Sequence, residues 1–345
     1  MSTISYQKVH NQFKMNGFHF DRDSMLRVAY CLIKEGADYE KPVGNFFLDW
    51  FDEKSYLEIP TSGSTGPSKT VRIEKQAMVN SALATGDFFG LKPGDRALHC
   101  LPVKYIAGKM MFVRAFILGL DIDFVAPSAH PLENNTTKYD FAAMVPMQAQ
   151  NSLDALKNIK KLIVGGAKVS DKLEHELSKL PYQVYITFGM TETITHIAAK
   201  KVGEKWFTTL PNVKIGIDDR QCLTIDASKI SDEKIITNDI VEIQNDNQFH
   251  FIGRLDNVVN SGGIKLIPEQ IEKKLDPYFN KRFFVAGLAD ENLGEKLVLV
   301  IEGLFFEIDP TIFDVLDKYE KPKDIIFKEK FNETLTGKVI RNDFF

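Results

Sequence analysis

The sequence is constrained most by a regular alternation of short apolar segments and helical periodicity between residues 55 and 188. The apolar segments are YLEIP (56–60), RALHCL (96–101), LDIDFV (120–125), KKLIVG (160–165) and YQVYITF (182–188). Helical patterns lie near 75–90, 108–119 and 170–179. Strands that alternate with helices in this way form a largely parallel sheet with helices on its faces. We therefore expect an α/β fold for this part of the chain.

The segment before this alternation predicts a small hairpin over residues 4–20, with Asn16-Gly17 as its turn. A helix should follow, capped by Asp21 or Asp23. The apolar face of that helix would consist of Met25, Leu26, Ala29, Leu32 and Ile33.

The segments after the alternation have two further patterns. Residues 206–251 are typical of antiparallel strands, with turns at 218–219 and 245–247. The last 90 residues form a compact βαβ-like pattern, with a helix from Pro268 and another at 309–318. We expect a large α/β domain over 1–255, with mixed or parallel sheets covered by helices, and a small α+β domain over 256–345 joined to it by a hinge.

Composition excludes several classes of protein. The 43 Lys and Arg against 47 Asp and Glu give a net charge of −4, which argues against a general nucleic-acid binder. No apolar run approaches the roughly 20 residues of a membrane span, and the N-terminus lacks an apolar signal region. The three cysteines have no CxxC spacing, which argues against a disulfide framework and a zinc site. We expect a cytoplasmic protein of small-molecule substrates, compatible with a homodimer.

The most informative motif is TSGSTGPSKT at 61–70, directly after an expected strand. Its glycines allow close approach of the backbone, and its hydroxyls and Lys69 can surround phosphate oxygens. It is not a Walker A loop, because Ser68 precedes the lysine. The alternative is a flexible surface loop. The residues predicted to bind phosphate are Ser62, Gly63, Ser64, Thr65, Gly66 and Lys69.

A second motif, TFGMTET at 187–193, also follows an expected strand. We expect a turn from strand to helix here, where α/β sheets place their ligands. Glu192 could hold Mg²⁺ and Thr191 could meet a phosphate oxygen. The alternative is a helix N-terminal capping box that begins at Thr191.

Three weaker signals lie further along the chain. Asp239 ends an apolar strand and could accept both hydroxyls of a ribose, although Asn-Asp is often only a turn. The paired glycines at 262–263 allow close backbone approach or a hinge. Lys338 follows a glycine near the C-terminus and could be a mobile cation, although a solvated tail is the alternative.

Taken together, the order of these motifs resembles the adenylate-forming superfamily of acyl- and aryl-CoA synthetases, luciferases and peptide-synthetase adenylation domains. The resemblance covers roughly residues 55–345 and includes GGA at 165–167 and GRLDN at 253–257. NSGGIKLIPEQIE and LPVKYIAGKMM resemble most the short o-succinylbenzoate–CoA ligases of menaquinone biosynthesis. The chain departs from the family in three places: only 60 residues precede the phosphate loop, Lys104-Tyr105 replaces an aromatic–His pair, and NETLTGK lacks the usual Pro and Arg.

This resemblance implies an ATP-dependent acid–CoA ligase that uses ATP, Mg²⁺ and coenzyme A. It implies Lys338, Thr191 and Glu192 as catalytic residues, with Glu192 also the metal ligand, and Asp256 as the hinge. The remaining nucleotide-binding residues would be Gly165, Gly166, Ala167, Thr187, Phe188, Gly189, Met190, Asp239 and Arg254; the CoA path would be lined by Ser261, Gly262 and Gly263; the candidates for binding the acid are Lys104, Tyr105, Lys109 and His196.

Several alternatives stay open at this point. The acid could be another aryl or acyl acid, or the acceptor could be a carrier-protein thiol. A nucleotide-binding protein that has lost catalysis is the alternative of another class. The usual N-terminal region of the family is shortened, and either residues 1–54 or a second subunit would cover the sheet there.

Overall fold

The computed structural model describes residues 4–60, 70–333 and 339–341. Its α-helices are α1 (Arg22–Lys34), α2 (Lys41–Phe51), α3 (Lys75–Phe89), α4 (Ile106–Leu118), α5 (Pro146–Asn151), α6 (Asp171–Ser178) and α7 (Pro268–Leu275). Its 3₁₀ turns are η1 (Leu156–Asn158), η2 (Leu255–Asn257), η3 (Asp276–Tyr278) and η4 (Pro310–Val315). Its strands are β1 (Lys14–Met15), β2 (Phe18–His19), β3 (Tyr56–Pro60), β4 (Thr70–Glu74), β5 (Arg96–His99), β6 (Asp121–Phe124), β7 (Tyr139–Met144), β8 (Ile159–Val164), β9 (Gln183–Gly189), β10 (His196–Lys201), β11 (Phe207–Thr209), β12 (Lys214–Ile217), β13 (Cys222–Asp226), β14 (Ile235–Asn245), β15 (Gln248–Arg254), β16 (Val259–Ser261), β17 (Ile264–Leu266), β18 (Phe283–Asp290), β19 (Gly294–Glu302) and β20 (Asp324–Lys328).

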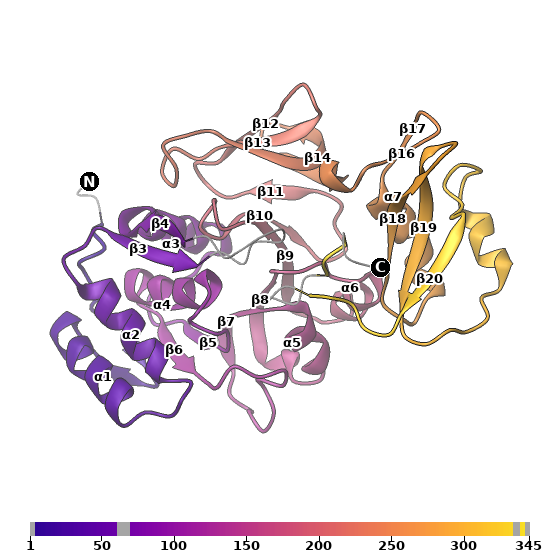
Figure 1. Ribbon diagram of the computed structural model, residues 1–345. Helices are drawn as coiled ribbons and strands as arrows, with labels where there is room; N and C mark the ends of the chain where they lie inside the picture. Colours follow the sequence, from indigo (N-terminus) through magenta and orange to yellow (C-terminus); the bar gives the residue numbers. More distant parts are fainter. Residues whose placement is uncertain (1–3, 61–69, 334–338, 342–345) are drawn as a thin grey trace.

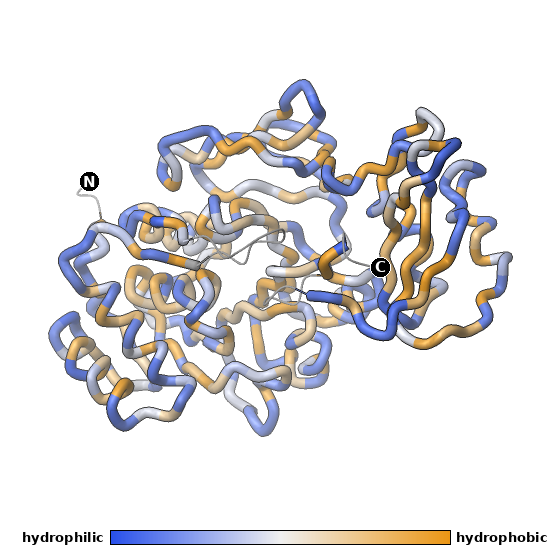
Figure 2. The backbone as a smooth tube through the Cα atoms, in the orientation of Figure 1, coloured by the Kyte–Doolittle hydropathy of each residue, from blue (hydrophilic) through white to orange (hydrophobic). Residues whose placement is uncertain are grey.

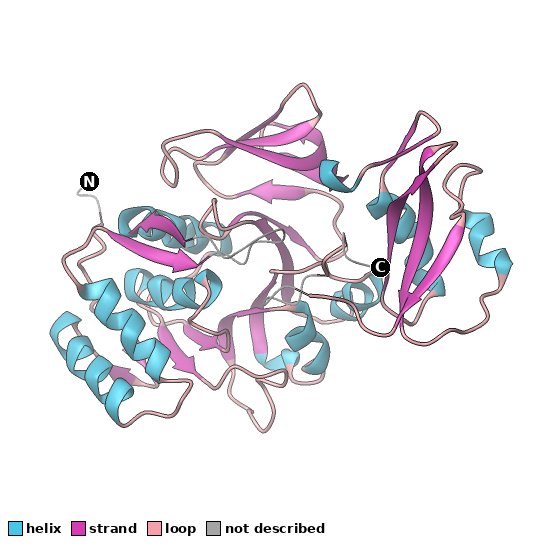
Figure 3. Cartoon of the chain, in the orientation of Figure 1, coloured by secondary structure: helices cyan, strands magenta, loops and turns pink. Residues whose placement is uncertain are grey.

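A mixed sheet of 13 strands runs through most of the molecule, in the order β12-β13-β14-β15-β11-β10-β9-β8-β7-β5-β6-β1-β2 (Figures 1 and 3). The run from β1 through β6, β5, β7 and β8 to β9 is parallel. From β9 to β12 every neighbouring pair is antiparallel. The expected α/β class is therefore confirmed, and the antiparallel half corresponds to the pattern read over residues 206–251.

Two details of the expected sheet are wrong. The segment 56–60 forms β3, but it pairs with β4 in a separate two-stranded antiparallel sheet and not with the large sheet. The strand that fills the parallel sheet instead is β7, which the sequence analysis did not find. Its sequence YDFAAM contains two alanines, which are depleted in strands, so its propensity signal is weak.

The helices cover both faces of the parallel part. Alternate residues of each strand face opposite sides, so Ala97 and Phe141 pack with α1–α4 in one core, whereas Leu98 and Ala142 pack with α5 and α6 in another. The expected helices near 75–90, 108–119 and 170–179 correspond to α3, α4 and α6.

The N-terminal segment packs on the face of the large sheet that carries α3 and α4. The hairpin is confined to 14–19, and its turn residues Asn16 and Gly17 have φ of 52° and 82°, as a two-residue hairpin turn requires. Asp21 caps α1 and accepts from the N–H of Ser24 at 2.8 Å. The rings of Phe47 and Phe112 lie 4.9 Å apart, so α2 covers α4 from within this chain.

The C-terminal part forms a smaller sheet with α7 beside it. β18 and β19 are antiparallel, and β20 pairs in parallel with β19. The α-helix expected at 309–318 is wrong. Only the 3₁₀ turn η4, which begins at Pro310, forms there. Figure 2 shows the apolar residues concentrated along β18 and β19. The large sheet ends at Arg254 and the small one begins at Val259, so the domain boundary at 255–256 stays a prediction that falls between them.

Candidate active site

The carboxyl ends of β8 and β9 lie close together at Gly165. A Cβ at this position would overlap Thr187 Oγ1, which itself donates to the carbonyl of Val164 at 3.3 Å, so any side chain here requires that hydroxyl to move. Gly166 has φ +84°, a left-handed conformation that favours glycine. The GGA turn therefore presents its backbone at the end of β8, and its expected contact with the nucleotide stays a prediction.

The TFGMTET segment does not form the expected turn from strand to helix. β9 runs to Gly189 and the chain returns directly as the antiparallel strand β10, because the turn is closed by its own side chains. Thr193 Oγ1 accepts from the N–H of Met190 at 2.9 Å and donates to Thr195 O at 2.7 Å. No helix begins at Thr191, so the capping-box alternative is wrong as well.

This turn contains a strained residue. Ile194 has φ 65° and is 2% exposed, although a β-branched side chain disfavours the left-handed region. Such strain costs of order 1–3 kcal/mol and is concentrated at functional sites. Next to it Glu192 is exposed and Thr191 is half-buried, so both side chains are available to a ligand.

Phe188 joins the turn to the antiparallel half of the sheet. Its ring lies 5.1 Å from Phe249 and 5.9 Å from Phe207, both edge to face. These contacts connect β9 with β11 and β15, although β10 lies between them in the sheet. The ring therefore has a packing role, and its proposed contact with a nucleotide stays a prediction.

Asp239 and Arg254 face each other across β14 and β15. Arg254 Nη1 donates to Asp239 Oδ1 at 3.1 Å, and Asp239 is only 4% exposed. Burial opposes the charge of Arg254, but the hydrogen bond to Asp256 and the charges of both carboxylates raise its pKa. Asn238-Asp239 lies inside β14, so the turn alternative for it is wrong.

The same guanidinium reaches the expected hinge residue. Arg254 Nη2 donates to Asp256 Oδ2 at 2.6 Å, and Asn238 Nδ2 donates to Asp256 Oδ1 at 2.8 Å. Arg220 in turn holds Asn238 through a 2.9 Å bond from Nη1. Arg220 was not predicted from sequence, because nothing local connects it with a strand that lies 18 residues away in the chain.

The four residues expected to bind the acid lie in different surroundings. Lys104 is exposed, and Tyr105 is the N-cap residue of α4. Lys109 lies 4.9 Å over the ring of Phe46, toward α2, and burial lowers its pKa. His196 is 6% exposed, and burial together with the charge of Arg114 lowers its pKa well below 6.5, so it is neutral at pH 7.

The cation beside His196 is Arg114, which sequence reasoning missed. It is 2% exposed in the middle of α4, and its guanidinium bonds Thr195 Oγ1 at 3.2 Å, Thr85 Oγ1 at 3.4 Å and Met111 Sδ at 3.6 Å. Within the described part of the chain it has no carboxylate partner, and burial lowers its pKa to about 10. The available signal was a single arginine inside the apolar segment IAGKMMFVRAFIL.

The remaining expected residues are placed only in part. Gly262 and Gly263 form the hairpin turn between β16 and β17, with φ of 59° and 83°, so the turn alone explains both glycines. The CoA path along them and Ser261 stays a prediction. The phosphate-loop residues and the terminal lysine lie outside the described residues: Ser62, Gly63, Ser64, Thr65, Gly66, Lys69 and Lys338.

Metal and membrane features are sparse. Among the described residues, no three His, Cys, Asp or Glu side chains group to hold a metal. Mg²⁺ commonly binds to one or two carboxylates together with substrate phosphates, so a single carboxylate such as that of Glu192 is sufficient. None of the described helices is long and apolar enough to span a membrane.

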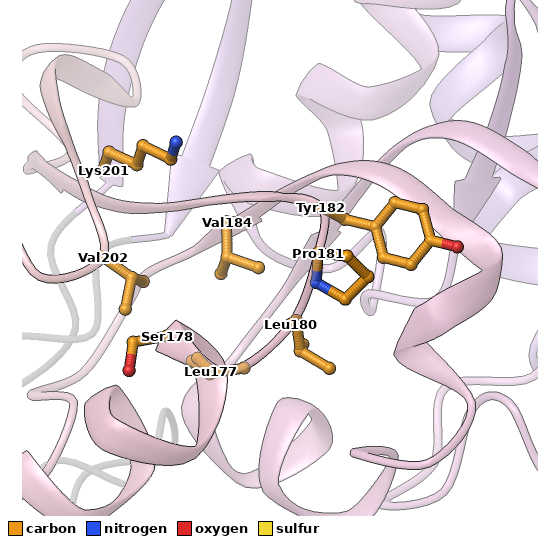
Figure 4. Close-up of a pocket in the computed structure, with 8 residues that line it drawn as sticks. All are labelled: Leu177, Ser178, Leu180, Pro181, Tyr182, Val184, Lys201 and Val202. Atoms are coloured by element: carbon orange, nitrogen blue, oxygen red, sulfur yellow. The ribbon is translucent and has the colours of Figure 1, made fainter.

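A cleft of about 160 Å³ lies away from the candidate active site. It is lined by residues such as Leu177, Tyr182 and Val202, at the beginning of β9 (Figure 4). Gly189 lies at the other end of that strand, so this cleft is not part of the site described above.

Curated proteins of known activity are similar to this chain in sequence. The 2-succinylbenzoate–CoA ligase of Salmonella typhimurium is 26% identical over 80% of this chain, and that of Listeria monocytogenes is 25% identical over 91%. The chain spans 66% and 74% of the length of these two relatives.

Solved structures are similar to this chain in fold. An AMP-forming acyl-CoA synthetase/AMP-acid ligase II-like protein from Dyadobacter fermentans is 34% identical, with a TM-score of 0.62 over 92% of this chain and 97% of that one. The o-succinylbenzoate coenzyme A synthetase of Bacillus subtilis, in complex with ATP and magnesium, is 19% identical with a TM-score of 0.72, over 83% of this chain and 69% of that one, and shows likeness of fold. The family model of AMP-binding enzymes matches residues 49–221, about half of the chain. This chain therefore belongs to the AMP-binding, adenylate-forming enzyme family.

Proposed function

We propose that this protein is an AMP-forming acid–CoA ligase whose acid is o-succinylbenzoate. The observation that carries the choice of acid is the buried guanidinium of Arg114 beside the 190–195 turn, which pairs with no carboxylate among the described residues. The curated relatives named above support the same choice, because both are 2-succinylbenzoate–CoA ligases.

In the first half-reaction, an oxygen of the acid attacks the α-phosphorus of ATP and pyrophosphate leaves. Both reactants are anions, so the site must supply cations and donors where charge develops. Asp239 and Arg254 would hold the ribose, and the backbone turns at 165–167 and 187–189 would face the adenine. Lys338 would neutralise charge between the carboxylate and the α-phosphate. Mg²⁺, with Glu192 as its protein ligand, supplies charge neutralisation on the phosphate oxygens when bound.

In the second half-reaction, the thiol of coenzyme A attacks the acyl carbonyl, and AMP leaves with the bonding electrons. The thiol would need the space that Lys338 occupies during adenylation. The small domain would therefore rotate about Asp256 between the two half-reactions. Arg254 and Asn238, both on strands of the large sheet, contact Asp256 in η2, where the chain leaves that sheet. These contacts support the placement of the hinge at Asp256.

The acid has two carboxylates, of which one reacts, and the other needs a partner. Arg114 has the required chemistry: a fixed cation, excluded from water, with Thr85 and Thr195 hydroxyls beside it. The carbonyl of Thr195 lies directly against Gly189, which is expected to bind the nucleotide. Thr195 also bonds Arg114, so a single residue separates the guanidinium from the nucleotide side of the site. His196 is neutral and would contribute a hydrogen bond rather than a charge.

Three other functions follow from the alternatives above. The Dyadobacter relative, an AMP-forming acyl-CoA synthetase-like protein, is compatible with another acyl or aryl acid. A carrier-protein thiol as acceptor, or a nucleotide-binding protein without catalysis, would use the same Asp239–Arg254 pair.

The deciding experiment is a coupled assay of the purified chain with ATP, Mg²⁺ and CoA. The acids supplied separately are o-succinylbenzoate, benzoate and a medium-chain fatty acid, and the thioester is identified by mass. Formation of AMP and o-succinylbenzoyl-CoA alone supports the proposal. Turnover of another acid but not this one would keep the ligase and reject the acid, and no AMP with any acid would favour a protein without catalysis.

A further inference from the structure

The small sheet ends in a strand with an open edge. Among the described residues β20 pairs only with β19, and Figure 1 shows it at the front of the small sheet. An open strand edge presents N–H and C=O groups that another strand can pair with. The question is what strand this edge would accept.

The backbone directions along β20 can be worked out from one hydrogen bond. The carbonyl of Lys328 accepts from the N–H of Gly303, which directly follows β19, at 2.8 Å. The peptide groups of Lys328 therefore face β19, and those of alternate residues face the other way. This places the N–H and C=O of Ile325 and Phe327 on the open edge.

The sequence of β20, DIIFK, is complementary to itself in the antiparallel direction. Two copies paired about Ile326 would place Asp324 of each opposite Lys328 of the other. Ile325 would then lie opposite Phe327, and these are the residues whose peptide groups face the edge. Opposite charges and aromatic–β-branched pairs are both favourable across strands.

The apolar surface beside the strand has the same symmetry. Leu304 and Phe305 are 77% and 76% exposed, and the ring of Phe305 lies 5.2 Å from that of Phe327 at one end of β20. At the other end Ile325 is 37% exposed, and Tyr319, in the segment that leads into β20, is 59% exposed. Antiparallel pairing brings opposite ends together, so each copy would cover the exposed apolar residues of the other.

We propose that the open edge of β20 is a self-association surface, at which two copies of this chain form a symmetric dimer about Ile326. The partner is a second copy because the charges, the apolar pairs and the facing peptide groups all match under the same twofold operation. A twofold contact uses the same β20 edge on both copies, so it closes at a dimer rather than growing into a fibre. The proposal does not depend on the acid or on catalysis.

The test is sedimentation equilibrium of the full chain, with light scattering after gel filtration, from about 1 to 300 μM, the range where small interfaces associate. We expect a concentration-dependent dimer. Lys328→Glu and Asp324→Lys should each weaken the dimer about tenfold or more, because each turns two attractive pairs into repulsive ones. An equal mixture of the two variants should dimerise again, since both pairs are attractive in the mixed dimer.

This mixture separates pairing from folding. Asp324 also pairs with Lys296 of its own chain at 2.8 Å, and damage to that contact would not be repaired by adding another variant. Ile325→Pro removes an N–H from the open edge only and should also give monomers. Tyr30→Ala, which removes an exposed ring from α1, is the matched control and should leave the dimer unchanged. Monomers at every concentration, a dimer that none of the β20 variants weakens, or a mixture that stays monomeric would each overturn the proposal.

Discussion

Replacing Arg114 by Met should move stability and activity in opposite directions. Burial lowers the pKa of Arg114 well below its usual value, to about 10, and each pKa unit corresponds to about 1.4 kcal/mol. Because the native pKa is the lower one, the charged form is disfavoured in the fold. The cost reaches about 3 kcal/mol at all pH values below about 10 and disappears only as the pH approaches the usual pKa of arginine. Met fills a similar volume and carries no charge.

The same substitution should remove the partner of the second carboxylate. Truncating one member of a buried, hydrogen-bonded charge pair costs about 2–5 kcal/mol, which corresponds to a loss of about 30- to 4000-fold in kcat/KM for o-succinylbenzoate. An acid with one carboxylate, such as benzoate, should lose nothing. Arg114→Lys keeps the charge without the planar guanidinium, so its kcat/KM for o-succinylbenzoate should lie between those of the natural chain and the Met variant.

Thermal unfolding and steady-state kinetics check both parts of this prediction. We expect the unfolding midpoint of the Met variant to stay level or rise, and its kcat/KM to fall for the dicarboxylate only. A lower midpoint would mean that the guanidinium stabilises the fold. An equal loss for benzoate and o-succinylbenzoate would remove Arg114 from recognition of the second carboxylate.

Four other outcomes are expected. Lys338→Ala should slow adenylation at least about 100-fold, or about 3 kcal/mol, yet leave CoA transfer from a preformed adenylate intact; equal loss in both would contradict this. Asp239→Asn should raise the KM for ATP about tenfold or more and leave that for the acid unchanged in initial-rate kinetics. Lys104→Ala should change the KM for o-succinylbenzoate less than about twofold, since that side chain is exposed. Burial lowers the pKa of His99 from 6.5 to about 4, so its native form is neutral and about 2 kcal/mol of stability is lost between pH 7.5 and pH 5; urea titration of His99→Gln should show that much less pH dependence.

Local signals were sufficient where the physics is local. The turn at Asn16-Gly17 follows from two residues that tolerate positive φ, and Asp21 caps α1 because its carboxylate reaches an N–H three residues on. The motif order that gave the family likewise depends on residue types close together in the chain. β7 was missed because its alanines carry little strand propensity, and its place between β5 and β8 comes from packing on both faces.

The sequence by itself determined the family and the class of fold, and it predicted the residues that would bind the nucleotide. Only the tertiary structure decided where charge is buried. Arg114 bonds Thr195, which lies 81 residues away in the chain. Arg254 bonds Asp239, which lies 15 residues away on the neighbouring strand. Periodicity reports which face of an element is apolar, but not which distant element covers that face. The value of a charge depends on the dielectric and the partners around it, and those are fixed only when α4, β9 and β10 pack together.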